Sequence, residues 1–328
     1  MNLKNIFKVL RVVFLCAVIY YVFGRNLDTI KSALLTLPAG FAVLLLCLGM
    51  VYYLLEGLTN YLAFRKRNRI SPKQGFALSM LGMFANVTTA GVGAVPLQTF
   101  YLSKQGIDLG NAAGTFLYNY VLHKLSAILL AAFFTVCAFF LGRPDLSPFY
   151  AYILYGFAVG LLICALMIAA ALSNRLNGLA GKLIQKLPDH FKKQREALLQ
   201  NLSLLQEEVG QELKDTKTGV LILITDLLKF LSLCLLPAVI CSKLGYPVTT
   251  FEAMAFLALT LAISGSLPNV SGMGPIEFAF MLFYGPLIGN DNVAGLLLVY
   301  RLANYFFPFL ISLVIVLFVR KKGSGSEQ

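Results

Sequence analysis

The feature that most constrains this chain is a series of long apolar runs separated by short polar or charged segments. A helical run of about 20 apolar residues crosses the roughly 30 Å of hydrocarbon in a bilayer. The runs are continuous rather than alternating, which favours helices over a β-barrel. The first run has no clear small-x-small cleavage site, so we interpret it as a retained span rather than a signal peptide. The sequence predicts an all-α polytopic membrane protein with six full spans, at about 8–24, 39–64, 114–141, 149–172, 219–241 and 293–319.

Composition narrows the class further. Hydrophobic residues make up 58% of the 328 residues and charged residues 13%, while the net charge is +12. The basic residues lie at span ends and in short loops, without the aromatic interleaving of a nucleic-acid surface. The six cysteines form no CxxC pair, and the sequence shows no metal-ligand cluster or nucleophile–base pair. We therefore expect no nucleic-acid partner, no metal, no cofactor and no enzymatic activity.

Two further apolar segments, about 75–103 and 251–289, are interrupted by glycine, proline and polar residues. The positive-inside rule places the basic stretch 65–69 and the charged segment 173–218 in the cytoplasm. Segment 75–103 then begins and ends inside, and the basic C-terminal end makes 251–289 begin and end outside. We expect two re-entrant helical hairpins entering from opposite faces, with both termini cytoplasmic. Two thin spans in place of each hairpin would leave the orientation unchanged. If each hairpin is counted as one span, the total is eight spans.

The two halves of the chain share one order of elements: span, span, hairpin, span. Their hairpin motifs share an offset of 181 residues, since Gly91 and Gly93 correspond to Gly272 and Gly274. This order with opposite orientation is typical of inverted-repeat transporters. We expect one integral membrane domain, 1–328, with inverted repeats at about 1–141 and 149–322. The intervening segment 173–218 reads as a cytoplasmic amphipathic helix on the protein or membrane surface, or as a partner-binding helix.

The hairpin tips are the first candidate site. Irregular backbone at membrane depth is tolerated only inside protein or beside a watery cavity. The second leg of each hairpin would start near Pro96 and Pro275, and the free N–H groups at helix N-termini suit anions. The expected tip residues are Gly91, Gly93, Pro96, Pro268, Gly272, Gly274 and Pro275.

Polar and ionisable side chains within the apolar segments are the second group of candidates, because such residues are costly in a membrane. Glu277 and Arg301 are expected to pair, either in transport or as a structural lock, and the Arg301 guanidinium also suits phosphate. Asp226 and Lys229 read as a local pair three residues apart. The candidates for substrate or headgroup binding are Asn86, Gln98, Lys124, Asn269, Glu277 and Arg301. The candidates for ion or proton coupling are Glu56, His123 and Asp226. A lone intramembrane histidine such as His123 is also typical of a hydrogen-bonded core residue. Glu56 could equally form a hydrogen bond to a broken stretch of backbone.

Two motifs resemble those of the lysylphosphatidylglycerol synthase transmembrane, or flippase-like, family. The first is NVTTAGVGAVPLQTFYLSKQGI at 86–107, and the second is SLPNVSGMGPIEFAF followed by LVYRLANYFFPFLISL. The chain departs from the family pattern at Val270-Ser271, where Pro-Gly is usual, and at Gln98, where arginine is common. Lys124 is a candidate substitute for that arginine. The second motif keeps Pro268, Gly272, Gly274, Glu277, Arg301 and Pro308 in register.

The resemblance implies lipid translocation in the cell (cytoplasmic) membrane, as in the N-terminal flippase domain of multiple peptide resistance factor. We expect the separate catalytic domain of that protein to be absent here, and with it the phosphatidylglycerol lysyltransferase activity that the family name suggests. The implied partners are an anionic phospholipid, an aminoacyl-phospholipid or a glycolipid, with a homo-oligomer and a separate lipid-modifying enzyme as further options. The alternatives are an ion- or proton-coupled exporter of a small polar solute, a lipid-phosphate enzyme, and a purely structural partner protein.

Overall fold

A computed structural model describes residues 38–324, apart from 69, 90, 143, 187, 189–191 and 268–273. The regular structure of these residues is helical throughout, in agreement with the predicted fold class. The expected first span at 8–24, the expected tip residues Pro268 and Gly272, and the candidate headgroup-binding residue Asn269 lie outside the described residues.

Five helical stretches of the described chain are long and apolar enough to cross a membrane. They match the five predicted spans that fall within the described residues. Many of their large apolar side chains are exposed, as expected for surfaces that face lipid rather than water. The stretches are α3 (Ala39–Asn68), α6 (Leu109–Leu141), α7 (Tyr150–Leu172, preceded by a 3-10 turn, Ser147–Phe149), α10 (Thr216–Leu244), and a last one formed by α13 (Asn290–Arg301), η4 (Leu302–Phe306) and α14 (Phe307–Ser324).

The segment after α3 forms a pair of short helices, α4 (Pro72–Thr88) and α5 (Ala94–Ser103). A capping box starts α4, because the Ser71 hydroxyl accepts from the N–H of Gln74 and the Gln74 side chain accepts from the N–H of Ser71. The connection turns at Gly91, whose φ of 94° is open mainly to glycine. At the other end of the pair, the Gln74 amide donates to the Gln105 side chain over 2.6 Å.

A second pair of short helices comprises α11 (Thr250–Ser264) and α12 (Pro275–Ile288). The hydroxyl of Tyr284 on α12 donates to the carbonyl of Ala253 on α11 over 2.6 Å, which fastens the two helices together. These helices pack with α10 and α13 in the largest hydrophobic core of the described chain. Helix α5 starts at Ala94 and α12 at Pro275, 181 residues apart, and the starts of α6 and α13 have the same offset.

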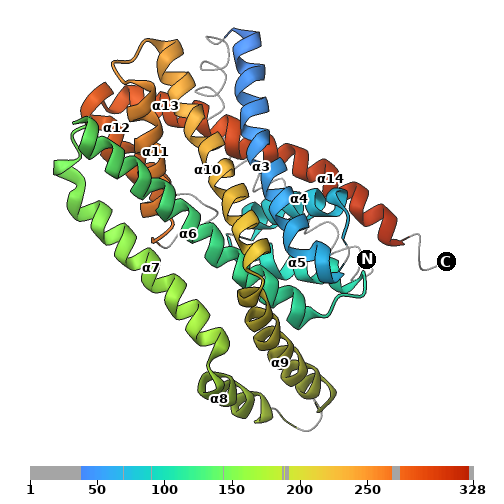
Figure 1. Cartoon of the computed structure of the whole chain (residues 1–328). Coiled ribbons are helices and arrows are strands. Elements are labelled where there is room, and N and C mark those ends of the chain that lie inside the picture. Colours follow the sequence, from blue (N-terminus) through green and yellow to red (C-terminus); the bar gives the residue numbers. More distant parts are fainter. Residues whose placement is uncertain are drawn as a thin grey trace.

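The two helix pairs approach from opposite ends of the molecule (Figure 1). At one end, helix α9 (Lys192–Lys214) lies beside the end of α3 and the start of α6, and α8 (Asn174–Gln185) packs against α9 and the end of α7. There Arg67 pairs with Glu208 over 2.7 Å, and the N–H of Gly110 donates to Asn201. Because α4 follows α3, and α5 leads into α6, the first pair opens toward this end. The second pair opens toward the far end, where α11 packs against the later part of α6, as shown by the Phe134–Phe251 ring contact.

The segment 173–218 differs in detail from the single amphipathic helix expected for it. It contains two helices, and α9 packs along α6 through Glu208, Val209 and Glu212, all of which are buried. Leu198 and Leu213 on the same helix are exposed. The buried glutamates contact polar groups on α3 and α6. The spacing of apolar residues along the segment does not reveal these contacts.

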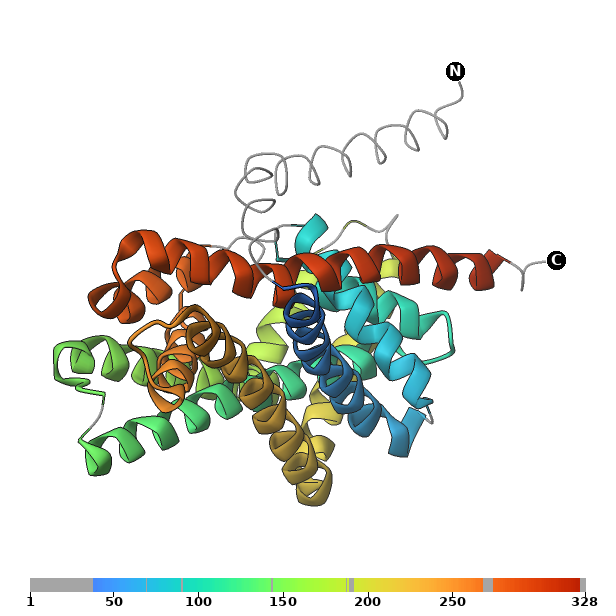
Figure 2. The same ribbon diagram turned by 90° about the horizontal axis from the view of Figure 1, so that it is seen from above.

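The last membrane-length stretch is also not one regular helix. Residues 302–306 form a π-helical segment, in which the N–H of Phe307 bonds to the carbonyl of Leu302. A β-carbon at Gly49 on α3 would lie 2.1 Å from the carbonyl oxygen of Ala303, so glycine lets α3 touch this segment backbone to backbone. In Figure 2 the last stretch, in red, passes across the first part of α3, in dark blue, which runs obliquely to it.

Candidate functional site

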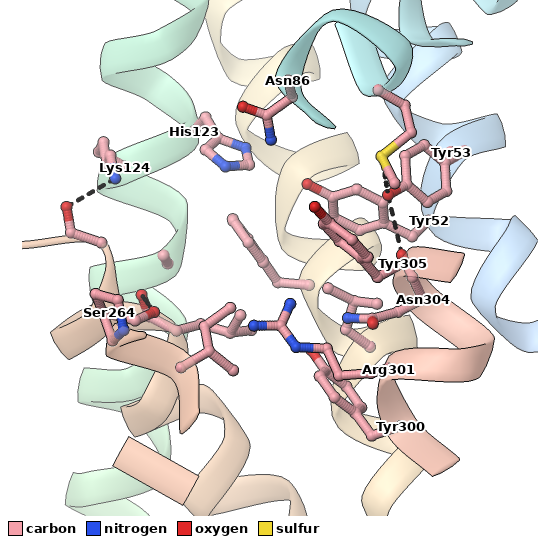
Figure 3. A pocket seen from close by; sticks show the side chains of 18 residues that line it. Tyr52, Tyr53, Asn86, His123, Lys124, Ser264, Tyr300, Arg301, Asn304 and Tyr305 are labelled. Atoms are coloured by element: carbon pink, nitrogen blue, oxygen red, sulfur yellow. Dashed lines mark hydrogen bonds between the residues drawn. The ribbon is translucent and has the colours of Figure 1, made fainter. Parts of the chain in front are cut away.

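A polar cavity of about 220 Å³ lies where the C-terminal part of α4, the end of α11 and the start of α12 meet the long helices. Its walls come from α3, α4, α6, α10, α11, α12 and the α13–η4 region, so both halves of the chain contribute (Figure 3). The polar and charged lining residues are Tyr52, Tyr53, Asn86, His123, Lys124, Ser264, Tyr300, Arg301, Asn304 and Tyr305.

Lys124 forms one wall of the cavity, on α6. Its ammonium donates to the carbonyl of Gly265 over 2.8 Å, directly after the end of α11. Carbonyls at a helix C-terminus carry partial negative charge, so a cation is favoured there. The contact joins the long helix of the first half to the tip of the second helix pair.

Arg301 approaches the cavity from the opposite side (Figure 3). Its Nε and Nη2 both donate to Oε1 of Glu277, over 2.9 and 2.5 Å. The other oxygen of Glu277 accepts from the N–H of Gly274 over 2.6 Å, at the start of α12. Glu277 therefore caps its own helix and orients the guanidinium. The expected pair of Glu277 and Arg301 is present, while a role in substrate binding stays a prediction.

Aromatic and amide groups supply most of the remaining polar wall. The Tyr53 hydroxyl donates to the carbonyl of Asn304 over 3.0 Å, within the π-helical segment. The side-chain oxygens of Asn304 and Tyr305 are buried and have no hydrogen-bond partner among the described residues. Buried polar atoms normally have partners, so these two atoms are suited to a bound polar ligand or water.

A charged cluster adjoins the cavity and consists of Glu56 on α3, His123 on α6, and Asp226 and Lys229 on α10. The Lys229 ammonium lies 2.6 Å from Glu56 Oε2, 2.6 Å from Asp226 Oδ1 and 2.9 Å from His123 Nδ1. Thr59 donates to the same Asp226 oxygen. Ligand atoms of Glu56, His123 and Asp226 lie within 4.8 Å of one another, a grouping that could hold a metal ion and that the sequence did not reveal. The Lys229 ammonium contacts all three, so a side chain supplies the positive charge.

Several residues proposed from the sequence come together here. Asn86, His123, Lys124, Pro275 and Arg301 line the cavity, although they are far apart in the chain. Glu56 and Asp226 lie in the adjoining charged cluster, with Glu56 bonded to Lys229 rather than to broken backbone.

The tip of the first helix pair lies apart from the cavity. Gly91 and Pro96 are exposed, and neither they nor Gly93 line the cavity. Helix α5 begins at Ala94 rather than at Pro96, which falls in its first turn. Gln98 is buried between α4 and α5, where it donates to the carbonyl of Leu78 over 2.8 Å. Its proposed contact with a headgroup stays a prediction.

Sequence reasoning missed part of the site. It treated Lys229 as a local partner of Asp226 and did not foresee its bond to Glu56 on another helix. It also missed the cavity tyrosines and Asn304. A usable signal existed for two of them, because Tyr300 and Tyr305 flank Arg301 within the second motif. The complete missed set is Tyr52, Tyr53, Lys229, Tyr300, Asn304 and Tyr305.

A second ionic group lies at the α9 end, outside the long apolar helices. Glu208 accepts from Arg67 and from the Thr115 hydroxyl. Burial, with smaller contributions from the negative charges of Glu208 and Asp215, raises the pKa of Glu212 to about 7, and Arg67 partly offsets the rise. Hydrogen bonding to Lys66 is the main cause that lowers the pKa of Asp215 to about 2.

The helices and the cavity define a multi-pass α-helical membrane protein with a charged, aromatic-lined site inside its helical bundle. The chain belongs to the family described as the lysylphosphatidylglycerol synthase TM region, whose model matches residues 8–312. That description refers to a transmembrane region, which is a domain separate from the catalytic part of the synthase. No curated protein and no solved structure matches the chain.

Proposed function

We propose that this chain moves the headgroup of an anionic or modified phospholipid, or of a glycolipid, across the cytoplasmic membrane. The observation that carries the proposal is the cavity, which the cations Lys124 and Arg301 line from opposite sides. A phosphate between them would be attracted by both charges. The exposed apolar surfaces of the long helices suit acyl chains that remain in the bilayer.

The state of Arg301 supports exchange rather than permanent pairing. Its guanidinium bonds to a carboxylate that is about one-third exposed, and a phosphate offers the same fork geometry. A headgroup entering the cavity would compete with Glu277 for Arg301. The unpaired oxygens of Asn304 and Tyr305 would accept hydrogen bonds from headgroup hydroxyl or amino groups.

The opposed helix pairs support a route to both faces. We propose that α4–α5 and α11–α12 are re-entrant hairpins within inverted repeats, which open alternately to the two sides. Lys124 donates to the carbonyl of Gly265 at the end of α11, and Asn86 on α4 lines the cavity. Motion of either helix pair therefore changes the cavity. In this proposal the chain transports lipid and performs no aminoacyl transfer. Assembly of several copies, or with a lipid-modifying enzyme, belongs to the same proposal.

The proposal is tested with purified chain in vesicles of phosphatidylglycerol and phosphatidylethanolamine that contain a trace of acyl-labelled fluorescent phosphatidylglycerol. Dithionite destroys the fluorescence of outer-leaflet probe, so continued loss reports movement between leaflets. We expect faster loss than in protein-free vesicles, with the rate reduced about tenfold or more in Arg301→Ala. Movement of the probe at the same rate in Arg301→Ala and Glu277→Gln would refute the roles assigned to them.

A second candidate is a proton-coupled exporter of a small polar solute, which the charged cluster beside the cavity favours. It predicts solute uptake that depends on a pH gradient and is indifferent to the labelled lipid. Lipid probe movement by the purified chain would decide against it.

A further inference from the structure

Helix α8 carries an exposed apolar sector, although it lies outside the membrane-length helices. The side chains of Leu176, Leu179 and Leu183 are 50%, 56% and 68% exposed. At about 100° per residue, these three leucines fall within a sector about 60° wide on one side of the helix. A contiguous apolar sector of this kind indicates a surface that an apolar phase or another molecule covers.

The orientation of the leucine sector is fixed, because the opposite side of α8 packs within the protein. Gly181 is buried there, and a β-carbon at this position would lie 3.6 Å from Leu199 on α9. On the same side, the Asn177 amide donates to the carbonyl of Ala171 over 3.0 Å. The leucines therefore face away from the bundle as a result of how α8 is attached.

A one-residue elbow sets the position of α8 relative to the span α7. Ser173 follows the last residue of α7 and caps α8, where its hydroxyl accepts from the N–H of Leu176 over 3.3 Å. Gln206 on α9 donates to the carbonyl of Leu172 over 3.3 Å and so holds the elbow from the other side. The helix turns away from the line of α7 at this point (Figure 1). The leucine sector consequently begins where the apolar span ends, at the depth of the membrane surface.

Positive charge lies beside the leucine sector. Residues 174–188 contain three basic and no acidic residues, and Lys182 and Lys186 are exposed. These two lysines lie within about 40° of each other around the helix axis, next to the leucines. An apolar sector bordered by basic side chains is typical of a helix that lies in a membrane interface. The positive-inside rule places this segment at the cytoplasmic leaflet, whose anionic lipids attract basic residues.

The same features argue against a second copy of the chain as the covering partner. A standard protein interface buries about 800 Å² on each side, which is more than three partly exposed leucines present. Two copies that met through this sector would also bring Lys182 and Lys186 of each chain close together. A lipid surface satisfies both features at once, because its acyl chains accept the leucines and its phosphates accept the ammonium groups.

We propose that α8 is an interfacial helix that binds anionic phospholipid of the cytoplasmic leaflet. Leu176, Leu179 and Leu183 enter the acyl region beside α7, and Lys182 and Lys186 hold headgroup phosphates at its surface. This lipid site is separate from the central cavity and takes lipid that stays in one leaflet. Its occupancy is independent of whether the chain moves lipid between leaflets.

The first experiment places a fluorescent reporter in the sector. The chain has no tryptophan, so Leu179→Trp gives the full chain a single indole. In vesicles of phosphatidylcholine and phosphatidylglycerol with brominated acyl chains, its fluorescence should fall about twofold or more, because an interfacial helix buries its apolar side among the chains. Leu183→Trp serves as a second reporter if the first variant misfolds.

The matched control is Gln185→Trp, on the same helix. Gln185 is exposed and lies about 150° around the helix axis from the leucine sector. Brominated chains should leave its fluorescence nearly unchanged, whereas aqueous acrylamide should quench it. Quenching of Leu179→Trp by acrylamide but not by brominated chains would show that the sector faces water and would overturn the proposal. Protection of that indole from both quenchers would identify a protein cover and overturn it as well.

The second experiment tests the preference for anionic lipid by brominating one lipid at a time in the same mixture. Brominated phosphatidylglycerol should quench Leu179→Trp about twofold more than brominated phosphatidylcholine at equal mole fraction, because the lysines concentrate anionic lipid nearby. Adding Lys182→Glu and Lys186→Glu should abolish the difference. Adding Lys73→Glu and Lys104→Glu, which alter two exposed lysines elsewhere, should preserve it. Equal quenching by the two lipids in Leu179→Trp itself would overturn the proposed headgroup preference.

Discussion

Lys229 on α10 donates to Glu56 on α3 over 2.6 Å, and this bond connects two membrane-length helices in a buried part of the bundle. The two residues are 173 positions apart in the chain. Because Asp226 accepts from the same ammonium, removal of the lysine leaves two acids without their shared cation. Both stability and transport should therefore depend on Lys229.

We expect Lys229→Met to destabilise the protein by about 3–5 kcal/mol, the usual cost of stranding a buried charge. Thermal unfolding in detergent would measure the change. The control Lys217→Met removes an exposed lysine near the start of the same helix and should have little effect. The double variant Asp226→Leu/Lys229→Met should recover part of the loss, because it removes both partners of one pair. Equal unfolding of Lys229→Met and wild type would show that the bond contributes nothing.

The geometry around Arg301 predicts that lysine cannot replace it. Two nitrogens of the guanidinium contact one oxygen of Glu277, whereas a lysine ammonium is a single point of charge on a flexible stem. Arg301→Lys should lower the rate of lipid probe movement about tenfold in vesicles. Arg175→Lys, at an exposed position on α8, serves as the control. A full rate in Arg301→Lys would indicate that charge alone is sufficient.

The raised pKa of Glu212 predicts that the packing of α9 depends on pH. The pKa lies at about 7 in the folded chain against an ordinary value of 4.5, so the folded state favours the protonated form. This contribution to stability is fully present below pH 4.5, decreases as the pH rises, and is lost above about pH 7. Helix α9 should therefore be held less firmly at pH 8 than at pH 5.

Hydrogen exchange across residues 198–213, corrected for intrinsic exchange rates, would measure this effect. Glu212→Gln should abolish most of the pH dependence, because an amide carries no charge at either pH. Glu207→Gln alters an exposed glutamate on the same helix and should retain it. Tighter protection of wild-type α9 at pH 8 than at pH 5 would contradict the sign of the prediction.

Close backbone packing predicts that Gly49→Ala is destabilising. The added β-carbon would lie 2.1 Å from the carbonyl oxygen of Ala303, and backbone atoms must shift to relieve the overlap. We expect a loss of about 1–3 kcal/mol, as for other overpacked sites, measured by thermal unfolding. Gly40→Ala on the same helix has nothing within 4 Å of the new atom and should be close to neutral. Similar stability for both variants would mean that α3 adjusts freely.

Hydropathy and charge placement predicted much of the fold. The five described long stretches fall where apolar runs predicted spans, because a helix in a bilayer must satisfy all of its backbone groups internally. Pro275 was correctly expected at the start of α12, since proline fits the first helical turn. The membrane position of the helix pairs and the repeat symmetry stay predictions.

Contacts between distant segments were harder to predict. The pair of Glu277 and Arg301 could be proposed because both are rare charges in one half of the chain. The bond between Lys229 and Glu56 depends on how α3 and α10 are rotated against each other, which apolar helices with weak amphipathic character do not reveal. The π-helical segment was also missed. Its carbonyl at Asn304 accepts a hydrogen bond from Tyr53 on another helix, and the sequence does not reveal such a contact between helices.

That π-helical segment has a consequence for how the cavity wall can move. A π-helical turn holds one more residue than the α-helical turn it replaces, so it acts as a dislocation in an otherwise regular rod. Moving the dislocation past one residue turns that residue by about 100° about the helix axis, since an α-helix has 3.6 residues per turn, while the helices on both sides keep their positions. Only the hydrogen bonds at the dislocation change at each step. Arg301, at its edge, can therefore be turned about the helix axis while Phe309, a few residues further on, stays packed in the interior.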